Sequence, residues 1–260
     1  MDLERLKNEW EALAKSDALG AILTDQTKAG GKWQLDEFMA TGEAEVVTVM
    51  EHLRQIGHEP DFAGAALDFG CGVGRLTQAL ARRFTSCVGV DISREMVDQA
   101  DRLNKYPQCR YVVNAESRLP FRDGEFAFIY CNIVLQHVPK RFAEEYLKEF
   151  MRLLAPDGVL VFGVQDSFAM PDVASRVTRI RQILRIRSRI KRALGSREGE
   201  MLMHCLPEDT VRTALGQKAK VVDIQWTNTA AKDFNGKLTY LDQPLRTGYV
   251  GRQYCVLKPS

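Results

Sequence analysis

The sequence of 260 residues predicts an α/β protein with an open, mostly parallel sheet between layers of helices. Between residues 63 and 165, short apolar segments alternate with segments in which apolar residues recur every three or four positions. Two more strand-like segments, 219–226 and 250–257, follow after an interruption and show alternation at every second residue. Strands and helices that alternate in this way are typical of a parallel sheet with right-handed crossovers. We therefore expect seven strands, the last two forming an antiparallel pair at the sheet edge.

Composition excludes several other classes of protein. Hydrophobic residues make up 45% and charged residues 27% of the chain, which is typical of a folded globular protein. The longest stretch without a charged residue, 126–139, is too short to span a bilayer. The first five residues lack the basic and apolar pattern of a secretory signal, so we expect a cytoplasmic protein. Its six cysteines are scattered without the spacing of zinc or iron–sulfur ligands, and no metal site is predicted.

Charge is balanced in total but uneven along the chain. Lys and Arg number 36 and Asp and Glu number 34, yet Arg176–Arg192 contains many basic residues and no acidic one. The remainder of the chain is therefore acidic on balance, which a uniformly basic nucleic-acid-binding protein would not be. The basic segment needs a separate explanation: a solvated covering helix, or a surface for a membrane, an acidic carrier or an acidic substrate.

The N-terminal region is predicted to be helical from about residue 3 to residue 57. Apolar residues recur at helical spacing in 46–56, and Gly30 and Gly31 divide the region into two helices. We expect one structural domain with four parts: an N-terminal helical cap (1–60), a core (61–166), a basic helical insertion after strand five (167–204), and a C-terminal part that completes the sheet (205–260).

The core elements follow in order. Strands are predicted at 65–69, 87–90, 110–113, 126–131 and 159–164. The first helix, 75–84, follows a glycine-rich turn, and Ser93 is a suitable N-cap for the second, whose apolar face includes Met96. The third, from about residue 142, ends before the turn Pro156–Gly158.

Three polar segments stand at the carboxyl ends of successive strands, where open parallel sheets bind their ligands. The first is the glycine turn Asp68–Gly74, in which glycines allow close approach of a ligand to the backbone. Asp91 ends the second strand, where a carboxylate can accept both hydroxyls of a ribose. Asn114–Glu116 follows the third strand and could bind an adenine edge. Taken singly, the first segment could be a structural turn, the second an Asp that simply ends a strand, and the third an ordinary polar loop.

These residues resemble the class I S-adenosylmethionine-dependent methyltransferases. Leu67–Gly74 is similar to the family's first motif, Val88–Ser93 to its second, Asn114–Phe121 to its third, and Leu153–Leu160 to the turn before strand five. The family more often has Asp at the positions of Asn114 and Ala127. The resemblance covers about residues 62–165 and implies a Rossmann-like, doubly wound fold.

The resemblance also implies roles for individual residues toward S-adenosylmethionine. Gly70, Cys71 and Gly72 would surround its methionine part, and Asp68 would bind its ammonium group directly or through water. Asp91 would bind the ribose. The remaining residues expected to contact the cofactor, through side chain or backbone, are Ile92, Met96, Asn114, Ala115 and Glu116, with Ile92 packing on the adenine and Asn114 and Ala115 binding its amino group. Cys131 and Asn132 would lie beside the reacting methyl group. Trp33 and Phe38 of the N-terminal cap are candidates for covering the cofactor, with core packing as their alternative role.

The acceptor is less well defined by the sequence. His137 follows strand four and could act as a general base, or it could be a structural histidine; His204 is a weaker candidate. The spacing of Gly70, Gly72 and Gly74 differs from the G-x-G-x-x-G pattern of nicotinamide dehydrogenases. The segment after strand four resembles the small-molecule branch of the methyltransferases and lacks the Pro-Pro-Tyr motif of enzymes that methylate DNA adenine.

Two classes of function follow. The first is a methyltransferase that transfers a methyl group from S-adenosylmethionine to an oxygen or nitrogen of a small metabolite by in-line displacement, leaving S-adenosylhomocysteine. Its acceptor could instead be a lipid, a carrier-bound group or another acidic molecule held by Arg176–Arg192. The second is a non-catalytic scaffold that binds the cofactor. We expect no nucleic-acid partner. The sequence leaves the acceptor, the methylated atom and the oligomeric state open.

Overall fold

The computed structural model describes residues 2–259 apart from 26, 29, 171–202 and 232. Within them, one eight-stranded sheet has the strand order β3-β2-β1-β4-β5-β8-β6-β7. The first five strands are parallel to one another, whereas β8 pairs antiparallel with both β5 and β6. The strands are β1 (Ala65–Phe69), β2 (Ser86–Asp91), β3 (Cys109–Val113), β4 (Phe126–Cys131), β5 (Leu154–Ala169), β6 (Lys220–Thr227), β7 (Tyr240–Leu241) and β8 (Gly248–Leu257). The mostly parallel, Rossmann-like sheet and its antiparallel C-terminal strands confirm the predicted fold class.

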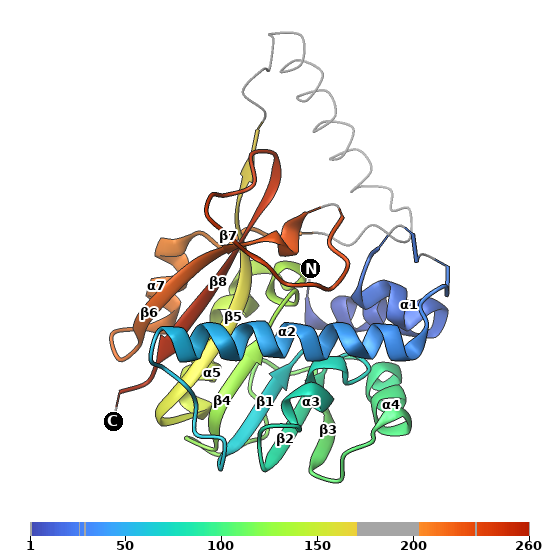
Figure 1. The fold of residues 1–260 in the computed structure, drawn as a ribbon, viewed down its shortest axis with the longest axis horizontal. Helices are drawn as coiled ribbons and strands as arrows, with labels where there is room; N and C mark the ends of the chain where they lie inside the picture. The colour runs from blue at the N-terminus through green and yellow to red at the C-terminus, as the bar shows by residue number, and fades with distance from the viewer. Residues whose placement is uncertain (1, 26, 29, 171–202, 232, 260) are drawn as a thin grey trace, which may run out of the picture.

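Helices cover both faces of this sheet. On one face, α2 lies across the strands above α3, and Figure 1 shows it at the front of the molecule. On the opposite face, α5 and α7 pack on β1, β4 and β5. The helices are α1 (Leu3–Ile22), α2 (Leu35–Gln55), α3 (Arg75–Leu80), α4 (Arg94–Leu103), α5 (Lys140–Leu153) and α7 (Glu208–Leu215), with short 3-10 helices η1 (Leu135–His137) and η2 (Asn228–Ala230).

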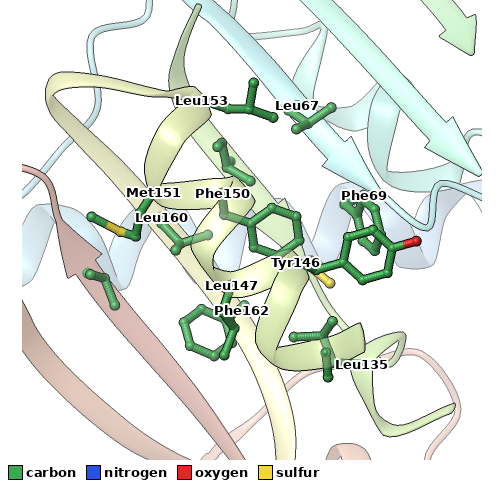
Figure 2. Packing of buried hydrophobic residues seen from close by; sticks show 14 of the residues in the cluster. Leu67, Phe69, Leu135, Tyr146, Leu147, Phe150, Met151, Leu153, Leu160 and Phe162 are labelled. Carbon is green, nitrogen blue, oxygen red and sulfur yellow. The ribbon is translucent and has the colours of Figure 1, made fainter. Parts of the chain in front are cut away.

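The core beneath α5 is built from apolar and aromatic side chains. Phe150 is fully buried and its ring packs edge-on against Phe69, with 5.0 Å between ring centroids. Tyr146, one turn earlier on α5, lies against the same Phe69 at 4.6 Å, and Figure 2 shows the three rings together. Burial of this apolar face explains why the segment forms a helix against the sheet. It also fixes the end of β1, where the glycine turn begins.

A buried ion pair fastens α2 to the rest of the core. The guanidinium of Arg75 donates to the Glu45 carboxylate at 2.8 Å, and the two side chains are 2% and 0% exposed. The other oxygen of Glu45 accepts hydrogen bonds from the Tyr130 hydroxyl (2.8 Å) and the Asn132 amide (2.7 Å). These hydrogen bonds satisfy a charge that would otherwise be very unfavourable in the interior. They hold α2 against α3 and the end of β4.

The structure differs from the sequence predictions at four places. Strand β5 begins at Leu154, five residues before the predicted start, and so includes the predicted turn Pro156–Gly158. Strand β5 continues to Ala169 because its last residues pair with Gly248–Val250, so residues 167–169 belong to a strand and not to the predicted helical insertion. The two-residue strand β7 pairs with the end of β6 and adds an eighth strand. Helix α3 ends at Leu80, earlier than its apolar pattern indicates. The basic segment Arg176–Arg192 lies outside the described residues. Among the helices that are described, none is both long and apolar enough to cross a bilayer.

Candidate functional site

A cavity of about 560 Å³ opens at the carboxyl ends of the parallel strands, beneath α1. One group of its lining residues comes from the loops after β1, β2 and β3: Gly70, Gly72, Asp91, Ile92, Met96 and Asn114. A second group, which we call the outer wall, comes from α1, η1 and the C-terminal segments: Trp10, His137, Met203, Ala230, Phe234 and Tyr249. Seven of the sixteen candidate site residues named from the sequence therefore meet at one cavity.

The glycine turn has a backbone that only glycine adopts easily. Gly70 and Gly72 have φ angles of 77° and 51°, in the left-handed region. A Cβ atom on Gly72 would lie 2.5 Å from Cδ1 of Ile22 at the end of α1, and one on Gly70 would overlap the side chain of Val134. The turn, which we call the glycine cradle, is thus closely packed against Ile22 and Val134 and leaves no room for side chains at these two positions.

Asp91 lies at the edge of this cradle. Its Oδ2 accepts a hydrogen bond from the Gly72 backbone N–H at 2.9 Å, and its Oδ1 accepts one from the Ser93 N–H at 2.9 Å. Burial raises the pKa of this carboxyl, while the two N–H groups act in the opposite direction. Each oxygen keeps a further lone pair, so the carboxylate can accept two more hydrogen bonds from a ligand.

The loop after β3 contributes Asn114. Its backbone N–H donates to the Asp91 carbonyl at 2.9 Å, which places the two predicted ligand-binding segments side by side. Its side-chain amide donates to the carbonyl of Glu116 at 2.6 Å and so closes its own loop. Ala115 and Glu116 do not line the cavity; the first is half-buried and the second is exposed.

Asp68 lies behind the cradle, outside the cavity lining. The Thr77 hydroxyl donates to its Oδ2 at 2.6 Å, whereas Oδ1 is buried with no hydrogen-bond partner among the described residues. Burial raises the pKa of Asp68 to about 7, against the influence of Thr77 and Arg75. An unsatisfied buried carboxylate oxygen beside a glycine cradle fits a ligand that carries a positive charge.

Five further predicted residues, from the glycine turn, the end of strand four and the N-terminal cap, lie away from the cavity lining. Cys71 and Cys131 are buried, and burial raises the pKa of both thiols. Asn132 is directed to Glu45 and not to the cavity. Trp33 and Phe38 pack edge-on at 5.6 Å, and the Trp33 indole donates to the Leu23 carbonyl, so both take the core-packing role.

Helix α1 covers the cavity instead. Leu6, Trp10, Leu13 and Ile22 all line it, and the helical spacing of the first three is the only sequence signal that they share. The helix is docked on α4 through Glu11, whose carboxylate accepts from the Ser93 hydroxyl (2.7 Å) and the Glu95 N–H (3.1 Å). Burial acts to raise the pKa of the Glu11 carboxyl, but these hydrogen bonds outweigh burial, and the pKa is lowered. A cover from the N-terminal helices is therefore present, made by other residues than those predicted.

His137 lies in η1 and is half-buried on the outer wall. The Trp10 ring packs edge-on against its imidazole, with 5.6 Å between centroids. Its Nε2 lies 3.4 Å from the Gln136 amide nitrogen, and the Gln165 amide holds the Gln136 oxygen at 2.9 Å. His204 does not line the cavity; its backbone N–H donates to the Gln136 carbonyl, and burial lowers the pKa of its ring.

Between β4 and η1, Ile133 has a φ of 53°. A β-branched residue rarely adopts this left-handed backbone, and such strain is concentrated at functional sites. Ile133 and the following Val134 line the cavity, so the strained turn directs the chain along it. The sequence carries no signal for this feature.

A group of potential metal ligands lies elsewhere, where α2 meets β6 and β8. Within the part of the chain that the structure describes, His52, Asp223 and Cys255 have ligand atoms within 4.8 Å of one another. His52 Nε2 and Asp223 Oδ2 already form a pair at 2.6 Å, and burial raises the pKa of the Cys255 thiol to about 12. The pair is explained by the attachment of α2 to the sheet.

Comparison with known proteins bears on this site. Residues 67–162 match the family model described as a methyltransferase domain. The predicted resemblance to the class I S-adenosylmethionine-dependent methyltransferases is confirmed over this segment. This domain includes the glycine turn, Asp91 and Asn114, whereas α1 and the C-terminal part of the outer wall lie beyond it.

Curated relatives match a part of the chain of similar length. The demethylmenaquinone methyltransferase of Lactobacillus johnsonii is 34% identical over 100 residues, covering 36% of this chain and 40% of the relative. The trans-aconitate 2-methyltransferase of Variovorax paradoxus is 33% identical over 111 residues, covering 42% and 41%. The matched segment is thus less than half of either relative.

Solved structures share the fold over a longer span. The magnesium protoporphyrin IX methyltransferase of Synechocystis, crystallised with S-adenosylhomocysteine, superposes with a TM-score of 0.58 and covers 99% of this chain and 100% of that one. A methyltransferase of Clostridium acetobutylicum superposes with a TM-score of 0.55, covering 84% and 92%. Identities of 18% and 16% mean that these similarities concern the fold.

Proposed function

We propose that this chain is an S-adenosylmethionine-dependent methyltransferase that acts on an oxygen or nitrogen of a small organic acceptor. The observation that carries the proposal is the contact between the Gly72 N–H and the Asp91 carboxylate at the edge of the cavity. It joins the glycine turn to a carboxylate that keeps free lone pairs and could bind a ribose.

The residues present fit the cofactor. Asp91 would accept hydrogen bonds from the ribose hydroxyls, and Ile92 would pack on the adenine, whose amino group Asn114 would bind. The cradle of Gly70 and Gly72 would surround the methionine part, for which Asp68 supplies a buried, partly unsatisfied carboxylate. When bound, S-adenosylmethionine supplies an electrophilic methyl group on a positively charged sulfur.

The chain's own contribution is alignment and exclusion of water. Helix α1 covers the cavity through apolar side chains and so removes the reactants from solvent. His137, oriented by Trp10 and Gln136, would accept the proton of the acceptor. The Gln165–Gln136 hydrogen bond would hold this segment in place.

Calorimetric titration tests the proposal. We expect S-adenosylhomocysteine to bind with a dissociation constant in roughly the micromolar range, and a nicotinamide dinucleotide not to bind. Binding of the dinucleotide in preference would contradict the cofactor assignment. A methyltransferase supplied with S-adenosylmethionine and an acceptor releases S-adenosylhomocysteine, whereas a binding scaffold releases none. The cytoplasmic location expected from the sequence stays a prediction.

A further inference from the structure

Two carboxylates lie in the part of the cavity lining that the structure describes. They belong to Asp17 and Asp91, and none of the described lining residues is a lysine or an arginine. Asp17 is held in a kink of α1, where its two oxygens accept from the backbone N–H groups of Gly20 (3.0 Å) and Gly31 (2.9 Å). Its carboxylate is therefore a fixed part of the site. A sulfonium ligand matches this field, and an anionic acceptor opposes it.

The outer wall is mainly apolar and aromatic. Phe234 is only 9% exposed, and the ring of Tyr249 is supported edge-on by Phe168 at 5.0 Å. Trp10 stands on the opposite element, α1, with its ring against His137. Met203 and Ala230 complete the surface. Rigid rings and a methionine are the surfaces that flat apolar molecules prefer.

Few polar side chains lie near the outer wall. Gln136 and His137 face the cavity from η1. Thr229 also lines it, and its hydroxyl is within 2.8 Å of the Thr227 hydroxyl. Each of these groups can exchange a hydrogen bond with a hydroxyl or an amine, and none is a lysine or arginine that would pair with a buried carboxylate or phosphate.

We propose that the acceptor is an uncharged, flat and largely apolar molecule that presents a hydroxyl or amino group to His137. This inference rests on the proposed function and defines its substrate class. A carboxylate or phosphate on the acceptor would enter a cavity with two fixed carboxylates and no cation among its described lining residues. Burial of an unpaired charge is strongly unfavourable, and no described lining residue would pair with it.

A matched pair of probes tests the inference. Binding of 2-naphthol and of 6-hydroxy-2-naphthoate is measured by calorimetry on the full chain saturated with S-adenosylhomocysteine, at neutral pH. The two molecules share the rings and the hydroxyl and differ in the carboxylate. We expect 2-naphthol to bind at least about tenfold more tightly.

A variant adds a positive charge to the outer wall. Ala230 is half-buried in η2 and lines the cavity, so Ala230→Lys should shift the preference toward the naphthoate by about tenfold. Thr239→Lys adds the same charge at an exposed position outside the cavity lining and should leave the preference unchanged. The S-adenosylhomocysteine affinity of each variant serves as its folding control.

The outcomes separate the two proposals. Tighter binding of 2-naphthol, reversed only by Ala230→Lys, supports the inference. Equal or tighter binding of the naphthoate to the unaltered protein overturns the inference, as does failure of both probes to bind while S-adenosylhomocysteine binds. Failure of S-adenosylhomocysteine itself to bind overturns the proposed function and this inference with it.

Discussion

The carboxylate of Glu11 accepts a 2.7 Å hydrogen bond from the hydroxyl of Ser93, and the same hydroxyl caps α4 by accepting from the Met96 N–H. Ser93 lies two residues after Asp91 and donates its own N–H to that carboxylate. A continuous set of hydrogen bonds therefore links the covering helix to the residue proposed to bind the ribose.

Removal of Glu11 should weaken cofactor binding more than folding. In Glu11→Ala, α1 loses its hydrogen bonds to Ser93 and Glu95, and we expect a three- to tenfold loss of S-adenosylhomocysteine affinity, about 1 kcal/mol. Glu9→Ala is the control, because Glu9 pairs only with the exposed Arg5. Calorimetry measures both variants. Equal effects of the two would contradict the proposed docking role of Glu11.

Asp91→Ala should lower S-adenosylhomocysteine affinity at least about tenfold, because hydrogen bonds to a charged acceptor contribute about 1.5–3 kcal/mol each. Asp98→Ala is the matched control on the neighbouring helix, since Asp98 is half-buried and does not line the cavity. An affinity of Asp91→Ala within twofold of the wild type would exclude the ribose assignment.

Gly72→Ala tests the cradle. The added Cβ meets Ile22 and requires a left-handed backbone, so we expect a loss of about 1–3 kcal/mol in the free energy of unfolding and a loss of cofactor affinity. Combining it with Ile22→Ala removes the contact but not the backbone strain. Part of the stability should therefore return in the double variant, as measured by urea unfolding. Strict additivity of the two effects would show that the side chains do not meet.

The buried carboxyl of Asp68 should make stability depend on pH. Its pKa is raised to about 7 from an ordinary 3.8, so the folded protein holds this proton more tightly than the unfolded chain does. The stabilising contribution is complete below pH 3.8 and is lost as the pH rises to about 7. Relative to wild type, Asp68→Asn should gain stability across this window, by at most about 1.4 kcal/mol per pH unit.

Urea unfolding between pH 4 and pH 8 measures the Asp68 effect. Thr77→Val provides a second check, because the Thr77 hydroxyl donates to the carboxylate and lowers its pKa. Loss of that hydroxyl should extend the pH window upward. Parallel stability curves for wild type and Asp68→Asn would rule out a raised pKa.

His137→Ala should separate catalysis from cofactor binding. We expect turnover to fall by about 100-fold or more if His137 accepts the acceptor's proton, with S-adenosylhomocysteine affinity unchanged. His204→Ala is the control histidine, since its ring lies outside the cavity lining. The pH dependence of kcat should change in His137→Ala and stay as in the wild type in His204→Ala. An unchanged profile would leave His137 a structural residue.

Much of the cavity wall formed by the loops after β1, β2 and β3 is predictable from local sequence. Each parallel strand of the core is a short apolar segment, and polar residues such as Asp91 follow where it ends, so strand order alone brings the ligand-binding loops together. Ser93 as the N-cap of α4 is confirmed for the same local reason.

The remaining features depend on contacts between distant residues. Trp33 and Phe38 look like covering residues in sequence, but the fold directs them into the core and places Trp10 over the cavity. Asn132 is paired with Glu45, which is 87 positions away in the chain. Extension of β5 to Ala169 requires β8 as its partner. The spacing of apolar residues within a short segment does not indicate such pairings between distant residues.

The segment shared with the methyltransferase domain family ends at residue 162, and the apolar side chains of the outer wall, Trp10, Met203, Ala230, Phe234 and Tyr249, all lie outside it. On the proposed function, most of the apolar surface that would meet the acceptor therefore comes from outside the segment that carries the glycine turn and Asp91. Substitutions after residue 202 would change that surface at positions distant in sequence from the methyl-donor site. Such a division suits the protein to evolving, or being engineered toward, new acceptors while its methyl-donor site stays fixed.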